Sequence, residues 1–595
     1  MLRPSSRISR HFLPGLVLAL LACLTLAGRA TTTAQGTFAG IPDSLEYDSA
    51  RRTYTLYLPP QTDEAPLVIA LHATASSGTA MAAQTKLHEA ANARGWAVAY
   101  PDSLALYWDD GRTSQDLGEE PVDDSGFIVA LIDSLAERYA IDPAQVYLTG
   151  IDGGGRLAYG LACQQPDTFA GVAVVSALMR ERTAESDCAE TTEPVNLLVV
   201  HGDDDRYEPE RGLTGIMSLR EVQMFWSARS GCGEPATSSG DVLSVTTYAG
   251  CAGETLTAVA RISGAGHVWP RTGGYALDHI GVDASDLIVR FLAGDPDWAD
   301  VPVTPDPDPE ETGPQRAYRF FAPISYDPAQ PIPVVFVLHG TPGTGLDMAF
   351  ITGMNAVAAR EGFIAVYPDA NDLRWDYRTS LVPTPQTPGL DDVVFLETLV
   401  DDLAIDFNID RQRIYVTGFS NGGFMTQRLA CDSYETFAAF AVVGATAYPD
   451  LPALCASAPG LAIMFIHGTA DRSVPWQGLT EINSLGQEVY LSWPVPQSVG
   501  FWVDHNACDT TADYVEVPKT DESAPTRVII NTFDGCDNDN PPVVFYLIEG
   551  GGHNWPGHPG FIGQQVAGDI NMDIDASEEI WTYFTGYTLG MTGGQ

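Results

Sequence analysis

The chain has 595 residues, which is too long for one hydrophobic core and fits two domains of roughly 250 to 300 residues each. Its residues are 45% hydrophobic and 10% aromatic, a composition typical of globular proteins that form a core. With a net charge of −46 and only two lysines, Lys86 and Lys519, its surface repels nucleic acids and anionic membranes, so we expect neither as a partner.

The N-terminus carries the pattern of a secretory signal. Arginines precede an apolar stretch over 12–27, and small residues follow it. We therefore expect residues 1–34 to be a signal peptide and the protein to be secreted, with no later stretch that is apolar enough to span a membrane. Leu20-Leu-Ala-Cys23 weakly resembles a lipoprotein cleavage box, so lipid attachment at Cys23 stays open as an alternative.

The remaining sequence contains two copies of one pattern, at 37–294 and 315–590. Matching segments recur in the same order along both copies. They are Leu71-His72 and Leu338-His339, Tyr100-Pro-Asp102 and Tyr367-Pro-Asp369, Trp108-Asp109 and Trp375-Asp376, 146–154 and 414–422, 201–206 and 467–472, and 266–270 and 552–556. Between the last two segments the second copy is longer by about a hairpin. We expect the two copies to share one fold.

Within each copy, short apolar runs alternate with segments of helical periodicity. In the second copy, helices are expected over 348–361, 392–406 and 422–431. A last helix closes each copy, at 283–292 and 575–585, and both begin with Asp-Ala-Ser, which suits a helix N-cap. This alternation predicts an α/β fold in which each copy has a mostly parallel sheet with helices on both faces.

Residues 295–314 join the copies and are rich in proline and acidic residues. Proline fixes φ and like charges repel each other, so we expect an extended, semi-rigid linker. The Asp-Pro repeats of the linker and the segment 537–540 raise the question of calcium, but neither has the spacing of a calcium-binding loop. We expect no metal ion and no cofactor.

The second copy contains Gly418-Phe-Ser420-Asn421-Gly422, a Gly-x-Ser-x-Gly motif between a β-branched run and a helical segment. A serine hydroxyl is a weak nucleophile, so it must lie on a sharp turn where a base can reach it. Gly418 and Gly422 occupy the positions at which a strand-to-helix turn needs residues without a Cβ atom. Because such motifs also recur by chance in glycine-rich chains, the context of the motif decides its meaning.

Two downstream segments provide the partners that a nucleophilic serine requires. Asp471 lies just past the apolar run 461–466, and His553 lies in a glycine-rich loop after the run 543–548. Each run is long enough for one buried strand. Because the sites of open α/β sheets form at the carboxyl ends of the strands, we expect both side chains to converge on Ser420 as a catalytic triad.

Upstream, an apolar run over 333–338 leads into the turn His339-Gly340-Thr341. In enzymes with this order of motifs, such a turn donates one oxyanion-hole amide, and the residue after the nucleophile donates another. We therefore expect an oxyanion hole made by the Asn421 amide and an amide of the Gly340-Thr341 turn. Three tryptophans adjoin these motifs and either line an apolar cleft or pack in the core: Trp375, Trp476 and Trp555.

Both copies resemble the secreted poly(3-hydroxybutyrate) depolymerase and feruloyl esterase family of α/β-hydrolases. The resemblance rests on Leu-His-Gly before the turn, Gly-Phe-Ser-Asn-Gly-Gly, His-Gly-Thr-Ala-Asp and Gly-Gly-His-Asn-Trp-Pro-Gly. It implies two tandem α/β-hydrolase domains, the second an extracellular serine esterase with Ser420, Asp471 and His553 as its triad. The substrate that it implies is a hydroxyalkanoate polyester or oligoester, such as one of hydroxybutyrate, or else a feruloyl or acetyl xylan ester of plant polysaccharide.

The first copy departs from this pattern at its centre. Asp152 takes the position of the serine, Gly153 that of the asparagine and Ala73 that of the turn glycine, while Asp205 and His267 remain at the positions of the acid and the histidine. In one interpretation this copy has lost catalysis and serves stability, domain contact or polymer binding. In the other, Asp152 is a nucleophile, as in haloalkane dehalogenases and epoxide hydrolases, although no cap domain or further motif of those enzymes accompanies it.

Eight of the nine cysteines lie outside the signal and divide equally between the copies, at matching places. In an exported protein an even set of cysteines predicts disulfides. The repeat favours four local pairs, which are Cys163 with Cys188, Cys232 with Cys251, Cys431 with Cys455, and Cys508 with Cys536. A metal site is the competing interpretation, but the sequence has no Cys-x-x-Cys motif and no clustered histidines.

Two further functions would use the same features. A polymer-binding protein would hold its ligand with both copies, and hydrolysis would be incidental. A serine peptidase would use the same triad on amide bonds. The sequence makes no prediction of the oligomeric state.

Overall fold

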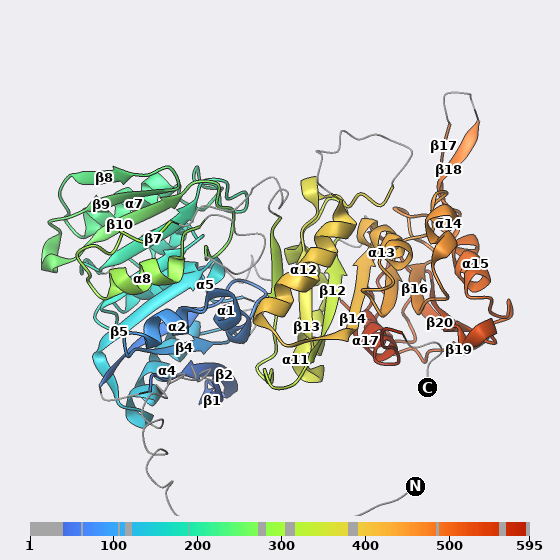
Figure 1. The fold of residues 1–595 in the computed structure, drawn as a ribbon, viewed down its shortest axis with the longest axis horizontal. Helices are drawn as coiled ribbons and strands as arrows, with labels where there is room; N and C mark the ends of the chain where they lie inside the picture. The colour runs from blue at the N-terminus through green and yellow to red at the C-terminus, as the bar shows by residue number, and fades with distance from the viewer. Residues whose placement is uncertain are drawn as a thin grey trace, which may run out of the picture. The chain divides into compact units, whose positions relative to one another are not determined.

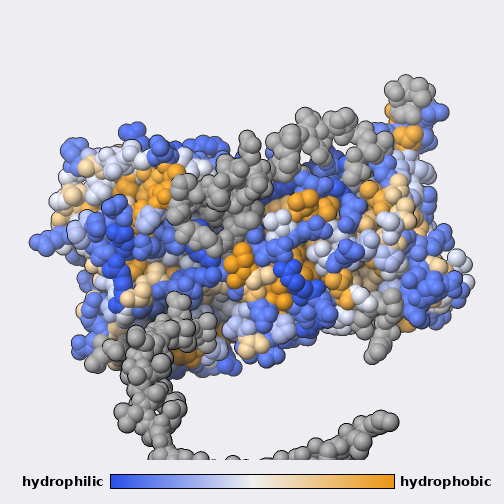
Figure 2. Space-filling model, in the orientation of Figure 1, coloured by the Kyte–Doolittle hydropathy of each residue, from blue (hydrophilic) through white to orange (hydrophobic). Residues whose placement is uncertain are grey.

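The computed structural model describes residues 40–60, 64–104, 107–112, 122–189, 191–271, 281–303, 316–378, 391–482, 487–558 and 567–590. The expected signal peptide, Cys23 and most of the expected linker lie outside these residues. From Gly40 onward the chain forms one compact unit. In the described part, none of the helices combines the length and the hydropathy that a membrane span requires. Figure 2 shows hydrophilic residues around separate apolar patches on the surface.

The first copy is built on a ten-stranded sheet (Figure 1). In spatial order its strands are β1 (Ile41–Tyr47), β2 (Ala50–Tyr57), β4 (Ala97–Pro101), β3 (Ala65–Leu71), β5 (Ile141–Ile151), β6 (Gly171–Val175), β7 (Leu197–Gly202), β10 (Thr257–Ile262), β9 (Leu243–Tyr248) and β8 (Pro235–Ser239). Neighbouring strands from β4 to β10 run parallel, whereas the outer pairs are antiparallel. The centre of the sheet is therefore parallel, as expected.

The second copy repeats this arrangement with nine strands. Their spatial order is β11 (Tyr318–Phe321), β13 (Ile364–Pro368), β12 (Ile332–Leu338), β14 (Ile409–Phe419), β15 (Ala439–Val443), β16 (Ile463–Gly468), β21 (Val543–Glu549), β20 (Arg527–Phe533) and β19 (Asp513–Glu516). The strands from β13 to β21 are parallel, and β11 is an antiparallel edge strand. A separate hairpin, β17 (Leu479–Ile482) and β18 (Glu488–Ser492), is the insertion expected between the acid and the histidine.

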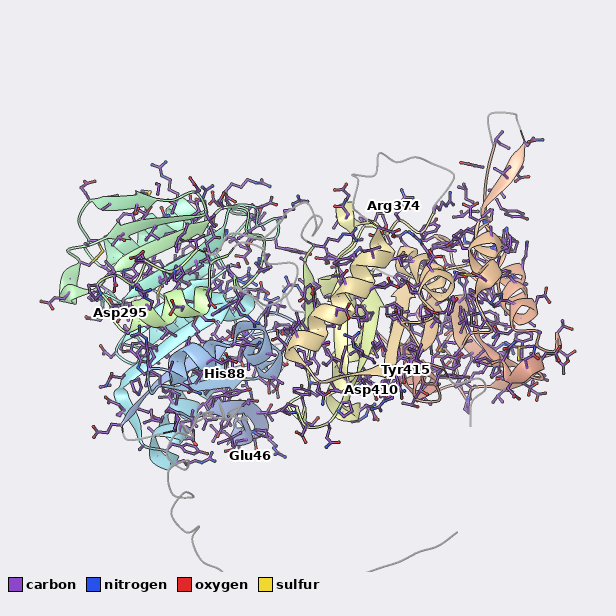
Figure 3. The ribbon with its side chains drawn as sticks, in the orientation of Figure 1. Glu46, His88, Asp295, Arg374, Asp410 and Tyr415 are labelled. Carbon is purple, nitrogen blue, oxygen red and sulfur yellow. A yellow bond between two sulfur atoms is a disulfide. The ribbon has the colours of Figure 1, made fainter. Side chains whose placement is uncertain are left out.

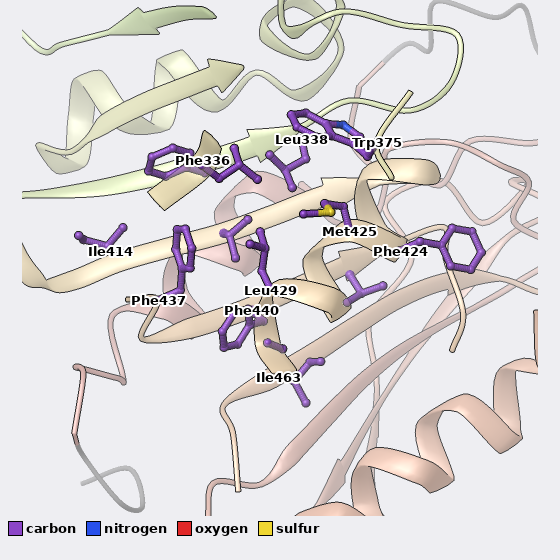
Figure 4. Close-up of a cluster of buried hydrophobic side chains, with 14 of the residues drawn as sticks. Phe336, Leu338, Trp375, Ile414, Phe424, Met425, Leu429, Phe437, Phe440 and Ile463 are labelled. Atoms are coloured by element: carbon purple, nitrogen blue, oxygen red, sulfur yellow. The ribbon is translucent and has the colours of Figure 1, made fainter. Parts of the chain in front are cut away.

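Helices cover both faces of each sheet, because successive residues of a strand point to opposite sides. In the first copy they are α1 (Gly78–Thr85), α2 (Leu87–Asn92), α4 (Asp124–Arg138), α5 (Gly153–Gln164), α6 (Glu181–Glu185), α7 (Leu219–Arg229) and α8 (Ala284–Leu292). In the second copy they are α10 (Gly345–Thr352), α11 (Met354–Glu361), α12 (Asp392–Asp406), α13 (Asn421–Asp432), α14 (Leu451–Leu454), α15 (Val495–His505) and α17 (Ala576–Phe584). Phe336 and Leu338 of β12 enter the core under α12 and α13 (Figure 4), while Val335 and Val337 enter the core on the other face.

The closing helix of each copy begins at the expected cap. Asp283 and Asp575 each accept hydrogen bonds from two backbone amides in the first turn of α8 and α17. In the second copy the ring of Tyr415 on β14 (Figure 3) stacks on Phe584 of α17, with ring centroids 4.8 Å apart. The last helix is therefore part of the core on that face of the sheet.

One expected helix is divided in the structure. The periodicity over 348–361 predicts a single helix, but α10 and α11 lie on either side of Gly353. Gly353 has φ 63°, a left-handed conformation that ends α10. The ring of His558 fills the space that a Cβ atom on Gly353 would need, and its Nε2 is 2.9 Å from Asp575 Oδ2. The prediction was wrong because the apolar pattern continues across this break.

Four disulfides join the eight cysteines of the two copies. They are Cys163–Cys188, Cys232–Cys251, Cys431–Cys455 and Cys508–Cys536. The first and third connect α5 and α13, the helices that follow the central strands, to the segments after the next strand. Disulfides that close loops of this length restrict the unfolded chain and so stabilise the folded one.

A matched pair of glycines in α5 tests how closely this helix must approach the sheet. A Cβ atom on Gly154 would lie 2.3 Å from the carbonyl oxygen of Leu71, whereas the nearest atom to a Cβ atom on Gly160 is 3.6 Å away. We predict that Gly154→Ala lowers the free energy of unfolding by about 3 kcal/mol, because the backbone must shift. Gly160→Ala should raise it by about 0.5 kcal/mol through helix propensity. Denaturation in guanidinium chloride would measure both, and equal effects of the two variants would contradict the prediction.

Candidate active site

Ser420 lies at the turn between β14 and α13, with φ 54° and ψ −117°. Residues other than glycine rarely adopt positive φ, so the surrounding packing must hold this conformation. Two glycines allow that packing. A Cβ atom on Gly422 would lie 2.3 Å from the Leu338 carbonyl oxygen, and one on Gly418 would lie 2.3 Å from the Gly422 oxygen. The helix can therefore start directly against the strands, with Ser420 half-buried at their carboxyl ends.

Asp471 and His553 form a hydrogen-bonded pair. Asp471 follows β16, and its Oδ1 accepts hydrogen bonds from the backbone amides of Ser473 and Val474, both at 2.8 Å. The Nδ1–H of His553 donates to the other carboxylate oxygen at 2.7 Å. Both side chains are buried. Because Nδ1 is engaged by the carboxylate, Nε2 is the nitrogen that can accept a proton from a neighbouring group.

Packing around the His553 ring sets it against the turn that carries Ser420. The ring centroid of Phe419, the residue before Ser420, lies 4.6 Å from that of His553. On another side, a Cβ atom on Gly444, directly after β15, would lie 3.3 Å from the same ring. The structure thus brings the predicted histidine and acid together and packs the histidine beside the residue that precedes the predicted nucleophile.

The turn Gly340-Thr341 and the start of α13 also adjoin Ser420. A Cβ atom on Gly340 would lie 3.1 Å from the Ser420 Cβ atom. Asn421 is the first residue of α13, where backbone amides have no partner within the helix. Its side chain is engaged elsewhere, since Oδ1 accepts the Trp375 amide at 2.7 Å and Nδ2 donates to the Trp375 carbonyl at 3.3 Å. The Asn421 side chain therefore holds the segment around Trp375 in place. Its backbone amide lies at the N-terminus of α13, next to Ser420.

An apolar wall continues from this turn. Phe424 lies one turn along α13, and its ring stacks on Tyr377 with centroids 4.8 Å apart. Tyr448 meets the same Tyr377 ring edge-on at 5.0 Å. Three tryptophans were candidates for such a wall, and the structure divides them: Trp375 and Trp555 are buried in the two cores, and Trp476 is half-buried. Figure 4 shows Phe424 and Trp375 among the buried side chains of this face.

A buried histidine precedes the turn in each copy. The Nδ1–H groups of His339 and His72 donate to the carbonyl of the next residue at 2.9 Å and 2.7 Å, and their Nε2 atoms accept backbone amides at 2.9 Å and 3.0 Å. Burial lowers the pKa of both, to about 4 for His72. Both rings are therefore neutral and hold the turn in place. Each ring therefore links its turn to the segment after the next strand of the same copy.

The first copy repeats the geometry with an aspartate at the turn. Asp152 has φ 54° and ψ −120°, close to the values of its serine counterpart. The Nδ1–H of His267 donates to Asp205 at 2.9 Å, and the Nε2 of His267 lies 3.7 Å from Asp152 Oδ1. Thr74, which corresponds to Thr341, donates its backbone N–H to Asp152 Oδ2 at 3.0 Å. In this copy the histidine and the turn amide both converge on the turn residue.

Four positions that are apolar in the second copy are charged in the first. They are Asp110 in place of Tyr377, Arg156 in place of Phe424, Arg180 in place of Tyr448, and Glu208 in place of Val474. Arg156 binds Asp110 at 2.8 Å and Asp152 at 3.0 Å, and it also pairs with Glu208. Burial alone would raise the pKa of Asp152, but the charges of Arg156 and Arg319 and the nearby His267 ring hold it well below its ordinary value.

Sequence reasoning missed this charged cluster, although part of its signal was present. Arg156 lies four residues after Asp152, on the same face of α5, and an alignment of the two copies puts it opposite a phenylalanine. Arg319 has no such signal, because it lies 167 residues from Asp152 in the chain. Among the residues that the structure describes, no group of three or more His, Cys, Asp or Glu side chains is arranged to hold a metal ion.

Comparisons with known proteins relate both copies to esterases and hydrolases. The model of the esterase PHB depolymerase family matches residues 52–190, and the model of the dienelactone hydrolase family matches residues 321–486. A protein of Nocardia uniformis subsp. tsuyamanensis that is named as an esterase, NocK, is 34% identical over 167 residues, which span 27% of this chain and 48% of that protein.

Two further relatives match over longer stretches. Poly(3-hydroxyalkanoate) depolymerase C of Paucimonas lemoignei is 26% identical over 285 residues, covering 44% of this chain and 64% of the depolymerase. A probable feruloyl esterase C of Aspergillus clavatus is 30% identical over 246 residues, covering 40% of this chain and 77% of that protein. The chain thus spans about half of the Nocardia protein and less than two thirds of the depolymerase.

Because burial lowers the pKa of His72, we expect the free energy of unfolding to depend on pH. Its pKa is about 4 in the folded state and 6.5 in the unfolded state, so its contribution is complete above pH 6.5 and is lost as the pH falls toward 4. The loss should reach about 3 kcal/mol at pH 4. We therefore predict that the difference in unfolding free energy between wild type and His72→Gln narrows between pH 6.5 and 4. A difference that stays constant over this range, measured by chemical denaturation, would contradict the prediction.

Proposed function

Since the chain belongs to the poly(3-hydroxybutyrate) depolymerase and feruloyl esterase family of α/β-hydrolases, we propose that its second copy hydrolyses carboxylic esters through an acyl-enzyme. In this proposal Ser420 is the nucleophile, His553 the general base and Asp471 the carboxylate that orients the histidine. The observation that carries it is the 2.7 Å hydrogen bond from His553 Nδ1 to Asp471, with the ring packed beside the strained turn of Ser420.

The equivalent atoms of the first copy support an approach of His553 to Ser420. There, Nε2 of His267 lies 3.7 Å from an oxygen of Asp152, the residue in the position of Ser420. The two turns have nearly the same φ and ψ, and both histidines donate Nδ1–H to the acid after the same strand. The repeat therefore supports an approach of His553 Nε2 to the Ser420 hydroxyl.

The reaction follows from these positions. Nε2 of His553 takes the hydroxyl proton as Oγ of Ser420 attacks the ester carbonyl carbon, and the carbonyl oxygen becomes an oxyanion. The amides of Asn421 and of the Gly340-Thr341 turn stabilise that charge, by about 3 kcal/mol per donor in comparable sites. The protonated His553 then gives its proton to the departing alkoxide. Water attacks the acyl-enzyme by the same steps, and the acid product leaves with Ser420 restored.

The surroundings of Ser420 favour a neutral ester with an apolar acyl group. The side chains of Phe424, Tyr377 and Tyr448 carry no charge themselves, and the net charge of −46 disfavours anionic substrates. Hydroxyalkanoate polyesters and their oligoesters meet both conditions, as the depolymerase relative suggests. A hydroxycinnamoyl ester is the second candidate, as the feruloyl esterase relative suggests. Four disulfides support an oxidising, extracytoplasmic location.

The hairpin β17–β18 is the segment that we assign to contact with a polymer. Its base is tied to the aromatic wall, since Arg378 donates to the Leu491 carbonyl at 2.7 Å and Trp493 donates its amide to Ala447, the neighbour of Tyr448, at 2.8 Å. Thr480 pairs with Tyr490 and Ile482 with Glu488, so these four side chains share one face. Ile482 and Tyr490 are 68% and 43% exposed on that face, which suits contact with an extended apolar chain.

Replacing the nucleophile tests the proposed chemistry. We predict that Ser420→Ala lowers kcat on 4-nitrophenyl butyrate at least ~1,000-fold, because the remaining donors and the binding site give little turnover. Ser457→Ala, at an exposed serine of the same copy, should have wild-type activity and serves as the control. A fluorophosphonate should label Ser420 in the wild type, as mapped by mass spectrometry. Near-normal ester hydrolysis by a folded Ser420→Ala protein would refute the assignment.

A second pair of variants tests whether the hairpin β17–β18 contacts a polymeric substrate. We predict that Ile482→Ser with Tyr490→Ser slows hydrolysis of a hydroxybutyrate film several-fold and leaves a hydroxybutyrate trimer unaffected, because only the film needs the hairpin face. Tyr514→Ser with Val515→Ser removes two exposed apolar side chains from β19 and serves as the control. If the hairpin variant hydrolyses film as fast as the control does, or loses film and trimer activity equally, the hairpin is not a polymer contact.

A further inference from the structure

The edge strand of the second sheet lies against the site of the first copy. Ser77 Oγ donates to the Ala322 carbonyl at 2.7 Å, and Ser76 Oγ donates to the Phe320 carbonyl at 3.1 Å. From the second copy, Nδ2 of Asn355 donates to the Ala75 carbonyl at 3.0 Å. Residues 73–77 are the counterpart of 340–344, the segment that carries the proposed oxyanion turn. The turn of the first copy therefore hydrogen-bonds the outer side of β11.

A buried ion pair enters the first site from the same strand. Nη1 of Arg319, on β11, lies 3.2 Å from Oδ2 of Asp152, and the two side chains are 12% and 7% exposed. The guanidinium carbon of Arg319 lies 5.4 Å from the centre of the Tyr207 ring, and the Tyr207 hydroxyl donates a hydrogen bond to Asp369 of the second copy. The second copy thus supplies a cation to the centre of the first site and a carboxylate to its rim.

These contacts engage both oxygens of Asp152. Oδ1 is bound by Arg156, and Oδ2 accepts both the Thr74 amide and the Arg319 guanidinium. A nucleophilic carboxylate needs one oxygen directed at a substrate carbon, with space for that substrate. The pocket between His267, Tyr207 and the strand residues up to Phe320 holds about 30 Å³. That is room for one or two water molecules, and ligand pockets are about ten times larger or more.

We propose that the site of the first copy is a docking socket for the second copy of the same chain, with Asp152 as the anchor of Arg319. The serine-to-aspartate change at the turn gives the socket its negative charge, and the turn amide that would bind an oxyanion binds the Asp152 carboxylate instead. Docking is the function of this copy, and ester hydrolysis belongs to the other. This assignment does not depend on the activity proposed for Ser420.

Hydrogen exchange on the full chain tests the socket. Arg319→Met removes the cation, and Asp152→Asn removes the anion while keeping a similar shape. We expect each variant to speed exchange of the peptides that cover 73–77 and 318–322 roughly tenfold. Arg319→Met should add nothing in the Asp152→Asn background, because the pair between the two residues is already broken there. Peptides within β15 and β16 should exchange at the wild-type rate.

Two controls separate docking from folding. Arg316→Met breaks a buried pair with Asp392 inside the second copy, so it should speed exchange there and leave peptides over 73–77 unchanged. Exchange of the peptides within β15 and β16 reports whether the second copy is folded in each variant, and Arg319→Lys should recover part of the protection at 73–77 and 318–322. Additive effects of the two single variants, or wild-type exchange in folded Arg319→Met, would overturn the proposal. So would alkylation of wild-type Asp152 by 1,2-epoxy-3-(4-nitrophenoxy)propane, sought by mass spectrometry.

Discussion

The constraint on which both halves of the structure depend is a strained turn held by glycines. Ser420 and Asp152 share φ 54° and nearly the same ψ, a conformation that costs about 1 to 3 kcal/mol outside glycine. It persists because α13 and α5 start against backbone oxygens at distances that only Gly422 and Gly154 permit. In the first copy this turn places the Asp152 side chain beside His267 and the backbone amide of Thr74. What that side chain then does depends on its chemistry, since the backbone is the same.

Replacing the serine by aspartate changes the demands of the whole site. A buried carboxylate needs cations and hydrogen-bond donors, because leaving it unpaired is strongly unfavourable. The first copy meets that need with Arg156 on the next turn of α5, with the amide of Thr74 and with Arg319. Arg156 in turn is balanced by further acids at positions that are apolar in the second copy. The charged residues around Asp152 therefore depend on one another. The second copy has aromatic residues around Phe424 at the corresponding positions instead.

The sequence was sufficient for the features that depend on local pattern. The repeat, the parallel sheets, the caps at Asp283 and Asp575 and the inserted hairpin all follow from periodicity and motif order. The division of the helix at Gly353 was missed, because the apolar positions keep their spacing across it. The partner of Asp152 was out of reach for a different reason. Arg319 lies 167 residues away on a strand of the other copy, and nothing in either local sequence marks that contact.

The edge strand β11 also connects the contact between the two copies to the turn proposed to hold the oxyanion. β11 pairs with β13, which pairs with β12, and β12 ends at the turn that carries Gly340. An edge strand normally exposes unpaired carbonyl groups, which invite pairing with other chains. Here the hydroxyls of Ser76 and Ser77 in the first copy donate hydrogen bonds to the Phe320 and Ala322 carbonyls. The first copy therefore covers part of the open edge of the second sheet, which gives a domain with aspartate in place of the proposed nucleophile a physical reason to remain beside it.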